Sequence, residues 1–155
     1  MAINPNTTFV TGAVYTADQA NRFPRGVMAY TESTTAMGTF SSETVAITGS
    51  SFTAVANRYY KVTYFEPDPY SVTSTGYYGM AIRITNISGA IKNIGYNNFV
   101  SATLNNALGS VYWVGTLSAG TTNFVGTLGT NTGTMSSNRG PSTVAFLLVE
   151  DIGPA

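Results

Sequence analysis

The sequence predicts an all-β protein, an antiparallel two-sheet β-sandwich with a jelly roll as the favoured topology, preceded by an N-terminal arm and one short helix. Thr, Ser and Asn make up roughly a third of the chain, well above ordinary usage. Thr suits half-exposed strands, whereas Asn, Ser and Gly suit turns. Short segments that alternate polar and apolar residues recur between such turns. An immunoglobulin-type sandwich is the alternative, although its Cys-Trp-Cys pattern is missing.

The helix signal lies near the N-terminus. Residues 1–15 are predicted to be extended, and Thr16 is a candidate N-cap. Gln19 follows three residues later, which completes a capping box. A helix over 17–23 would end before Pro24, because a residue that precedes proline is disfavoured in helical conformation.

Alternating segments predict the strands of the sandwich, and we assign 1–25 to the arm and helix and 26–155 to the sandwich domain. Residues 88–108 are ambiguous, because many Asn and Gly favour a loop with at most a short strand. Residues 129–142 are predicted to form a long loop for the same reason. The segments with the strand pattern are 26–30, 44–48, 52–56, 58–65, 77–87 and 143–149.

A further pair of strands is predicted as a hairpin. The segments 111–117 and 122–128 both contain Val-Gly-Thr-Leu and are separated by a short turn with Gly120. Two strand patterns joined by a Gly-containing turn typically pair with each other.

The segment 143–149 is apolar on both faces. A strand of an antiparallel sheet usually has one wet face, so this pattern predicts a central strand with a covered outer face. Because no helix is predicted to cover it, we expect a neighbouring subunit there, with Val144, Phe146 and Leu148 as interface residues.

Composition excludes several classes of chemistry. The chain contains no His and no Cys, which rules out serine-histidine and cysteine-histidine catalysis and disulfides, and leaves a zinc site without its usual ligands. The acids Glu66 and Asp68 lie between prolines and are predicted to form a solvated turn rather than a catalytic pair or a calcium site. We therefore expect no enzymatic activity, no catalytic residue, no cofactor and no metal.

Charge and hydropathy restrict the partners and the location. Seven Lys and Arg are balanced by seven Asp and Glu, so the basic surface of a nucleic-acid binder is missing. No run of eighteen apolar residues predicts a membrane span, and the N-terminus lacks the pattern of a secretion signal. Synthesis in a cytoplasm is the expectation.

Several candidate interaction residues can also be explained as ordinary surface or core residues. The pair Glu150-Asp151 reads as a solvated C-terminal turn or as a charge contact with a neighbouring protein, and Arg22 and Arg25 read as ordinary surface charges or as anchors of the arm. Tyrosines on strands are usually core, but exposed ones can stack on sugar rings. The candidates for attachment are Phe9, Tyr15, Arg22, Arg25, Glu150 and Asp151. The candidates for a glycan platform are Tyr70, Tyr77 and Tyr78.

Two segments resemble small structural proteins of bacteriophages, of the type found in phages of actinobacteria. Residues 7–21 resemble the opening of such proteins, in which a short helix ends in Asn, and residues 147–154 resemble their C-terminus. The stretches 58–63 and 117–121 are similar to strand and turn patterns of trimeric jelly rolls.

This resemblance implies a virion protein without enzymatic activity, made in the host cytoplasm and commonly a homotrimer. A capsid decoration or minor capsid protein, bound to the major capsid protein, is the favoured reading because no long fibre stem is present. The alternative is a minor tail or tail-fibre-type protein that contacts tail proteins and binds host-surface glycan through loops 66–79 and 129–142.

Overall fold

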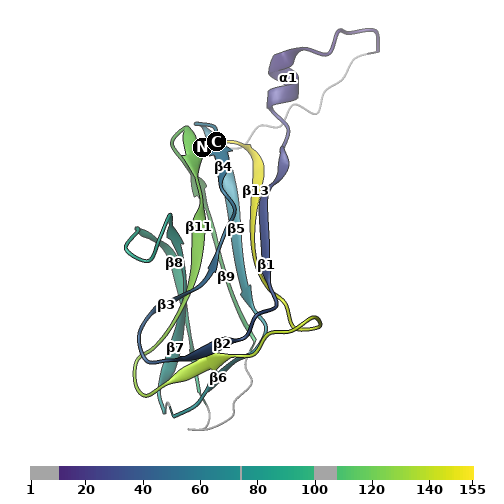
Figure 1. The fold of residues 1–155 in the computed structure, drawn as a ribbon. Helices are drawn as coiled ribbons and strands as arrows, with labels where there is room; N and C mark the ends of the chain where they lie inside the picture. The colour runs from purple at the N-terminus through teal and green to yellow at the C-terminus, as the bar shows by residue number, and fades with distance from the viewer. Residues whose placement is uncertain (1–10, 74, 100–107) are drawn as a thin grey trace.

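A computed structural model describes residues 11–73, 75–99 and 108–155, and it confirms an antiparallel β-sandwich. Two four-stranded sheets are stacked on each other (Figure 1). The first, here called the β13 sheet, has the order β1 (Gly26–Ser33), β13 (Ala145–Pro154), β5 (Arg58–Glu66) and β9 (Gly109–Thr116). The second, the β11 sheet, has the order β3 (Thr44–Thr48), β11 (Phe124–Thr130), β7 (Tyr77–Ile84) and β8 (Ile91–Asn98).

Smaller elements close the two ends of the sandwich. The strands β2 (Met37–Phe40), β12 (Met135–Ser137) and β6 (Pro69–Ser71) form a three-stranded sheet, and β4 (Phe52–Ala54) pairs with β10 (Gly120–Thr122). Figure 1 shows β2 and β6 across one end, whereas the helix α1 (Ala17–Asn21) stands away from the strands at the other.

The predicted capping box is present in α1. The Thr16 hydroxyl accepts the backbone N–H of Gln19 at 3.2 Å, and Gln19 Oε1 accepts the backbone N–H of Thr16 at 2.9 Å. The helix ends at Asn21, two residues earlier than expected. The ring of Phe23, just beyond, lies 6.4 Å from that of Tyr15 and so folds the segment back on itself.

The core lies between the two sheets. The predicted alternation in β5 is confirmed, because Tyr60, Val62 and Tyr64 point inward and are fully buried. From the opposite sheet, Met80 and Ile82 of β7 complete the packing. Burial of each aliphatic side chain stabilises the fold by about 1.5–3 kcal/mol relative to exposure.

Gly126 of β11 lies where this core has no room for another carbon. A Cβ at Gly126 would stand 2.8 Å from the Tyr64 ring and 2.9 Å from the Ile47 methyl. We expect Gly126→Ala to lower the free energy of unfolding by about 1–3 kcal/mol through overpacking, measured by urea denaturation. Gly95→Ala, with nothing within 4 Å of the added carbon, is the control, and an equal loss in both variants would contradict this account.

The predicted hairpin of 111–117 and 122–128 is wrong. The strand β9 pairs with β5, and β11 pairs with β3 and β7, so the two segments lie in opposite sheets. The connection between them crosses from one sheet to the other and contributes β10 to a pair with β4. The turn residues correctly indicated a short connection between β9 and β11. The pairing, however, is with strands distant in sequence, β5 for β9 and β3 and β7 for β11.

The ambiguous segment 88–108 and the predicted long loop 129–142 both contain strands. Residues 91–98 form β8, an eight-residue strand at the edge of the β11 sheet, and residues 135–137 form β12. The Asn-rich composition of β8 is compatible with an edge, where side chains remain in water. Pro69 begins β6, which is also an edge strand, as a proline without an N–H requires.

Candidate interaction surface

The strand β13 lies between β1 and β5, which confirms the prediction of a central strand. Its burial alternates strictly between buried and half-buried residues, so its outer face is only partly covered within the single chain, and cover by a neighbouring subunit stays a prediction. Ala145, Leu147 and Val149 point into the core, whereas Phe146 and Leu148 lie half-buried on the outer face. Val144, the third predicted interface residue, is half-buried immediately before the strand.

Apolar side chains from neighbouring strands gather around Phe146 and Leu148. Phe146 stacks on Phe65 of β5 with ring centroids 5.1 Å apart and contacts Tyr30 of β1 at 6.2 Å. Leu148 is flanked in register by Tyr30 and by Thr63. The outer face of the β13 sheet therefore has a continuous aromatic and aliphatic centre.

This apolar area extends to both edges of the sheet. Val27 of β1 is 63% exposed, and Tyr112 and Val114 of β9 are 62% and 46% exposed. Among the strand residues of this face the charged ones are Glu32, Lys61 and Glu150, with Lys61 Nζ 3.8 Å from Glu150 Oε2. Contiguous exposed apolar area with few charges is typical of a protein–protein contact surface.

The predicted attachment residue Asp151 is instead part of the interior, and the alternative of a solvated C-terminal turn at Glu150-Asp151 is wrong. The strand continues through Pro154, and Asp151 is 1% exposed. Its carboxylate forms a bidentate ion pair with Arg58: Nη2 of Arg58 donates to Asp151 Oδ1 at 2.8 Å, and Nε donates to Oδ2. A buried charge needs such a partner, so Asp151 cannot contact another protein. Glu150 is half-buried beside Lys61.

Arg58 also holds the segment that follows α1. Its Nη1 donates to the Asn21 carbonyl and its Nη2 to the Phe23 carbonyl, both at 2.6 Å. The hydrogen bond to Asp151 is the main reason that the pKa of Arg58 lies above its usual value, and it outweighs the opposing effect of burial. The Arg58–Asp151 pair therefore joins the base of the arm to the end of β13.

Of the other predicted attachment residues, Tyr15 and Arg25 are exposed and Arg22 is half-buried. Phe9 lies outside the described residues. The structure thus places three of the arm candidates in the projecting segment, apart from the apolar outer face of the β13 sheet.

The expected solvated turn at Glu66 is also wrong. Glu66 is fully buried and bound on both carboxylate oxygens by Arg139, at 2.6 and 2.8 Å. The hydroxyls of Tyr64 and Ser137 donate to the same carboxylate at 2.7 and 2.6 Å. Burial, then the charge of Glu66, raises the pKa of Tyr64 well above its usual value. No substrate reaches this carboxylate, so the cluster is structural.

Within the parts of the chain that the structure describes, no helix has the length and apolar character needed to span a membrane. The same parts hold no group of three or more Asp, Glu, His or Cys side chains placed to share a metal ion.

Comparison of the chain with protein-family models and with curated proteins finds no match. Among solved structures, the chain is similar to Eiger TNF from S. frugiperda, with a TM-score of 0.50 and 14% identity over 84% of this chain and 96% of that one. The fold is a jelly roll. This likeness supports the expected topology over the immunoglobulin-type alternative and, at such low identity, shows the fold alone.

The jelly roll separates the three tyrosines predicted as a glycan platform. Tyr78 is buried in the core against Phe99, with ring centroids 5.0 Å apart, so it cannot stack on a sugar. Tyr70 is half-buried on β6. Tyr77 is 41% exposed and has an unpredicted neighbour, Tyr96 of β8, whose ring lies 5.2 Å away and edge-on.

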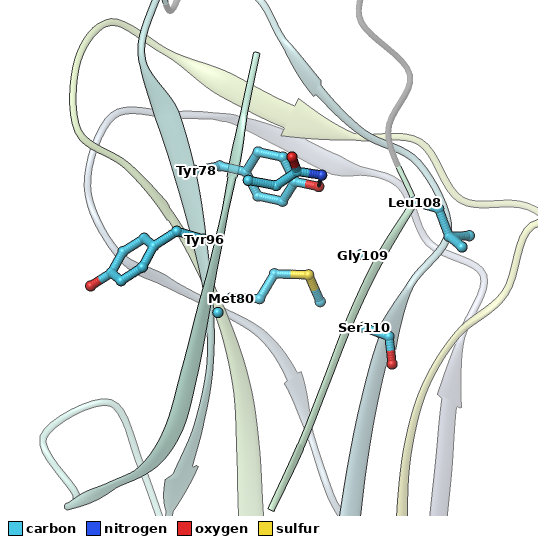
Figure 2. Close-up of a pocket in the computed structure, with 8 residues that line it drawn as sticks. Tyr78, Met80, Tyr96, Leu108, Gly109 and Ser110 are labelled. Atoms are coloured by element: carbon cyan, nitrogen blue, oxygen red, sulfur yellow. Dashed lines mark hydrogen bonds between the residues drawn. The ribbon is translucent and has the colours of Figure 1, made fainter.

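A cavity of about 150 Å³ opens between β7, β8 and β9 of the jelly roll (Figure 2). Figure 2 shows Met80 pointing across it toward Gly109, while Tyr96 points away from it. A Cβ at Gly109 would overlap Met80 Sδ, so this glycine lets the methionine fill the space. Its lining mixes the apolar side chains of Met80 and Leu108 with polar groups of Asn97 and Ser110. We assign no ligand to it, because Met80 occupies part of the space between the sheets.

Proposed function

We propose that this chain is a non-enzymatic structural subunit of a bacteriophage particle, which binds the capsid surface as a decoration or minor capsid protein and assembles with copies of itself. The exposed apolar outer face of the β13 sheet carries the proposal. The resemblance of residues 7–21 and 147–154 to phage structural proteins supports the location and a homotrimeric state.

The occupant that best fits the outer face is a second copy of the chain. Its centre, formed by Phe65, Phe146 and Leu148, would bury apolar area, which drives most association. Its charges are of both signs, so Lys61 of one copy can meet Glu32 of another. Because the chain has no net charge, electrostatic repulsion between copies is weak and does not oppose their association.

The projecting arm is the element that would reach the capsid. A helix as short as α1 is not stable alone in water, and here a capping box and the Tyr15–Phe23 contact support it. Val14 and Tyr15 are 83% and 54% exposed beside it. Because the arm lies at the end of the sandwich, it can bind a neighbour without covering the outer face of the β13 sheet.

Leu148→Lys is expected to convert the oligomer to single chains of 16.3 kDa. The substitution places a desolvated cation between Tyr30 and Thr63 at the centre of the proposed contact. Size-exclusion chromatography with light scattering measures the mass, and circular dichroism verifies that the variant is folded.

Ile91→Lys is the matched control, because Ile91 is 46% exposed on a strand of the other sheet. It should leave the mass unchanged. A wild-type protein that runs as a single chain at high concentration, or a Leu148→Lys variant that keeps the wild-type mass, would overturn self-association through this face.

Electron cryomicroscopy of intact particles tests the location. Density for this jelly roll at symmetric capsid positions, with the arm against the capsid, supports the decoration role. Density only at the tail would refute that role and favour the tail-protein alternative.

A further inference from the structure

A second surface lies on the opposite side of the sandwich, on the outer face of the β11 sheet. It is a shallow cavity of about 190 Å³ between β7, β8 and β11. The volume is below the roughly 300–1,000 Å³ of pockets for drug-sized ligands. The cavity therefore has room for one small unit, and its open side allows that unit to be part of a longer chain.

Two glycines lie side by side in the floor of this cavity, which Ala81, Ile94 and Thr127 also line. In the strand register, Gly129 of β11 faces Gly79 of β7, which in turn faces Tyr96 of β8. The Tyr96 ring leans over Gly79, since a Cβ there would stand 3.1 Å from Tyr96 Cε1. A Cβ at Gly129 would likewise stand 3.1 Å from Glu43 Cα, so the two glycines let Tyr96 and Glu43 pack close to the sheet as the two walls of the cavity.

One wall of the cavity is a fixed aromatic platform. Tyr96 is 64% exposed, and Figure 2 shows its ring pointing away from the space between the sheets. Tyr77 packs edge-on against it at an interplanar angle of 86°. Edge-to-face packing restrains the Tyr96 ring while leaving ring surface for a ligand.

The opposite wall is polar and carries no net charge. Glu43 Oε1 accepts bonds from Arg83 Nε at 2.7 Å and from the Thr127 hydroxyl at 2.6 Å, and its Oε2 accepts from Arg83 Nη2 at 2.7 Å. The hydrogen bonds to Arg83 are the main reason that the pKa of Glu43 lies below its usual value. The carboxylate is therefore ionised and neutralised, yet its side chain is still 35% exposed and retains accepting capacity.

Asn131 adds a donor at the end of the cavity. Its Oδ1 accepts the backbone N–H of Tyr77 at 2.8 Å, which fixes the amide in place. The amide nitrogen carries two donors. The cavity thus combines an apolar ring face, a carboxylate acceptor and an amide donor.

We propose that this cavity binds one ring of a neutral saccharide, with the C–H face of the sugar on Tyr96 and its hydroxyls toward Glu43 and Asn131. A pyranose has an apolar face and a rim of groups that both donate and accept, which matches the two walls. The neutralised Glu43–Arg83 pair selects against charged sugars. The site does not depend on self-association, because it lies on the other sheet.

Saturation-transfer NMR with free monosaccharides tests this site, because a monovalent sugar gains no avidity from an oligomeric protein. The probes are glucose, galactose, mannose, rhamnose and N-acetylglucosamine, with glucuronic acid and glucosamine as charged comparators. We expect transfer to at least one neutral sugar and an affinity for it that falls about tenfold or more in Tyr96→Ala. Gly79→Ala should also weaken binding, because its Cβ would stand 3.1 Å from Tyr96 Cε1 and push the ring out of position. Thermal unfolding verifies that both variants are folded.

Tyr112→Ala is the matched control, since Tyr112 is 62% exposed on the other sheet. It should leave sugar binding unchanged even where it alters the oligomeric mass, so the two proposals fail independently. The saccharide site is overturned if no neutral sugar receives saturation, if only the charged sugars do, or if Tyr96→Ala binds as well as the wild type.

Discussion

Arg139→Met is expected to lower the free energy of unfolding by about 3–5 kcal/mol, the cost of leaving a buried charge without its partner. Arg139 is the cation that neutralises Glu66, and Glu66 is fully buried. The Arg139 side chain also donates to the Ala46 carbonyl at 2.9 Å, so its loss leaves a backbone acceptor unpaired as well. The methionine keeps much of the volume of the arginine stem, which limits the effect to charge and hydrogen bonding.

Urea denaturation of the wild type and four variants measures this effect: Arg139→Met, Glu66→Gln, the two combined, and the control Arg25→Met. The double variant Glu66→Gln with Arg139→Met should lose clearly less than the sum of the two single variants, because the charges are coupled. Arg25→Met, at an exposed arginine, should change the free energy of unfolding by about 0.5 kcal/mol or less. A loss below about 1 kcal/mol for Arg139→Met would show that water or a rearranged partner solvates Glu66.

Arg58→Met should have a comparable effect on stability, about 3–5 kcal/mol, and should also release the arm. Asp151 would lose its buried partner, and the carbonyls of Asn21 and Phe23 would lose the donor that fixes them to the sandwich. Limited trypsin digestion under native conditions reports the second effect, because Arg22 lies within the held segment. We expect cleavage after Arg22 to become much faster than in the wild type.

Arg83→Met is the control for arm release, since Arg83 also has a carboxylate partner but lies on the β11 sheet. It should not accelerate cleavage after Arg22. If Arg58→Met unfolds cooperatively with no early cleavage in the arm, the pair stabilises the sandwich without holding the arm.

Local patterns predicted the elements whose causes are local. The capping box of Thr16 and Gln19 and the alternation of Tyr60, Val62 and Tyr64 depend on residues within a few positions, and both were correct. The central place of β13 followed from its apolar composition. Pairing between strands was not predictable in this way, because β9 and β11 look like a hairpin locally and find their partners far away in sequence.

Buried charges were missed for the same reason. Glu66 lies among prolines and Asp151 among terminal residues, which are surface signals, but Arg139 and Arg58 approach them from distant parts of the chain. The outer-face position of Phe146 and Leu148 followed from the predicted central strand, whereas their role in a subunit interface stays a prediction. Tyr96 was missed because its stretch is rich in Asn, and no local pattern shows that Gly79 and Gly129 become neighbours beneath it.

The central position of β13 also has a consequence for biosynthesis. At ~5–20 residues per second, the roughly 80 residues between Glu66 and Ala145 take about 4–16 s to be translated. Until β13 is made, β1 and β5 each lack the neighbour that joins them in the finished sheet. During this interval β1 is unpaired and β5 keeps one open edge beside its pair with β9, and open edges invite contact with other nascent chains. Glu32 on β1 and Lys61 on β5 are charged residues of the type that discourages aggregation during this interval.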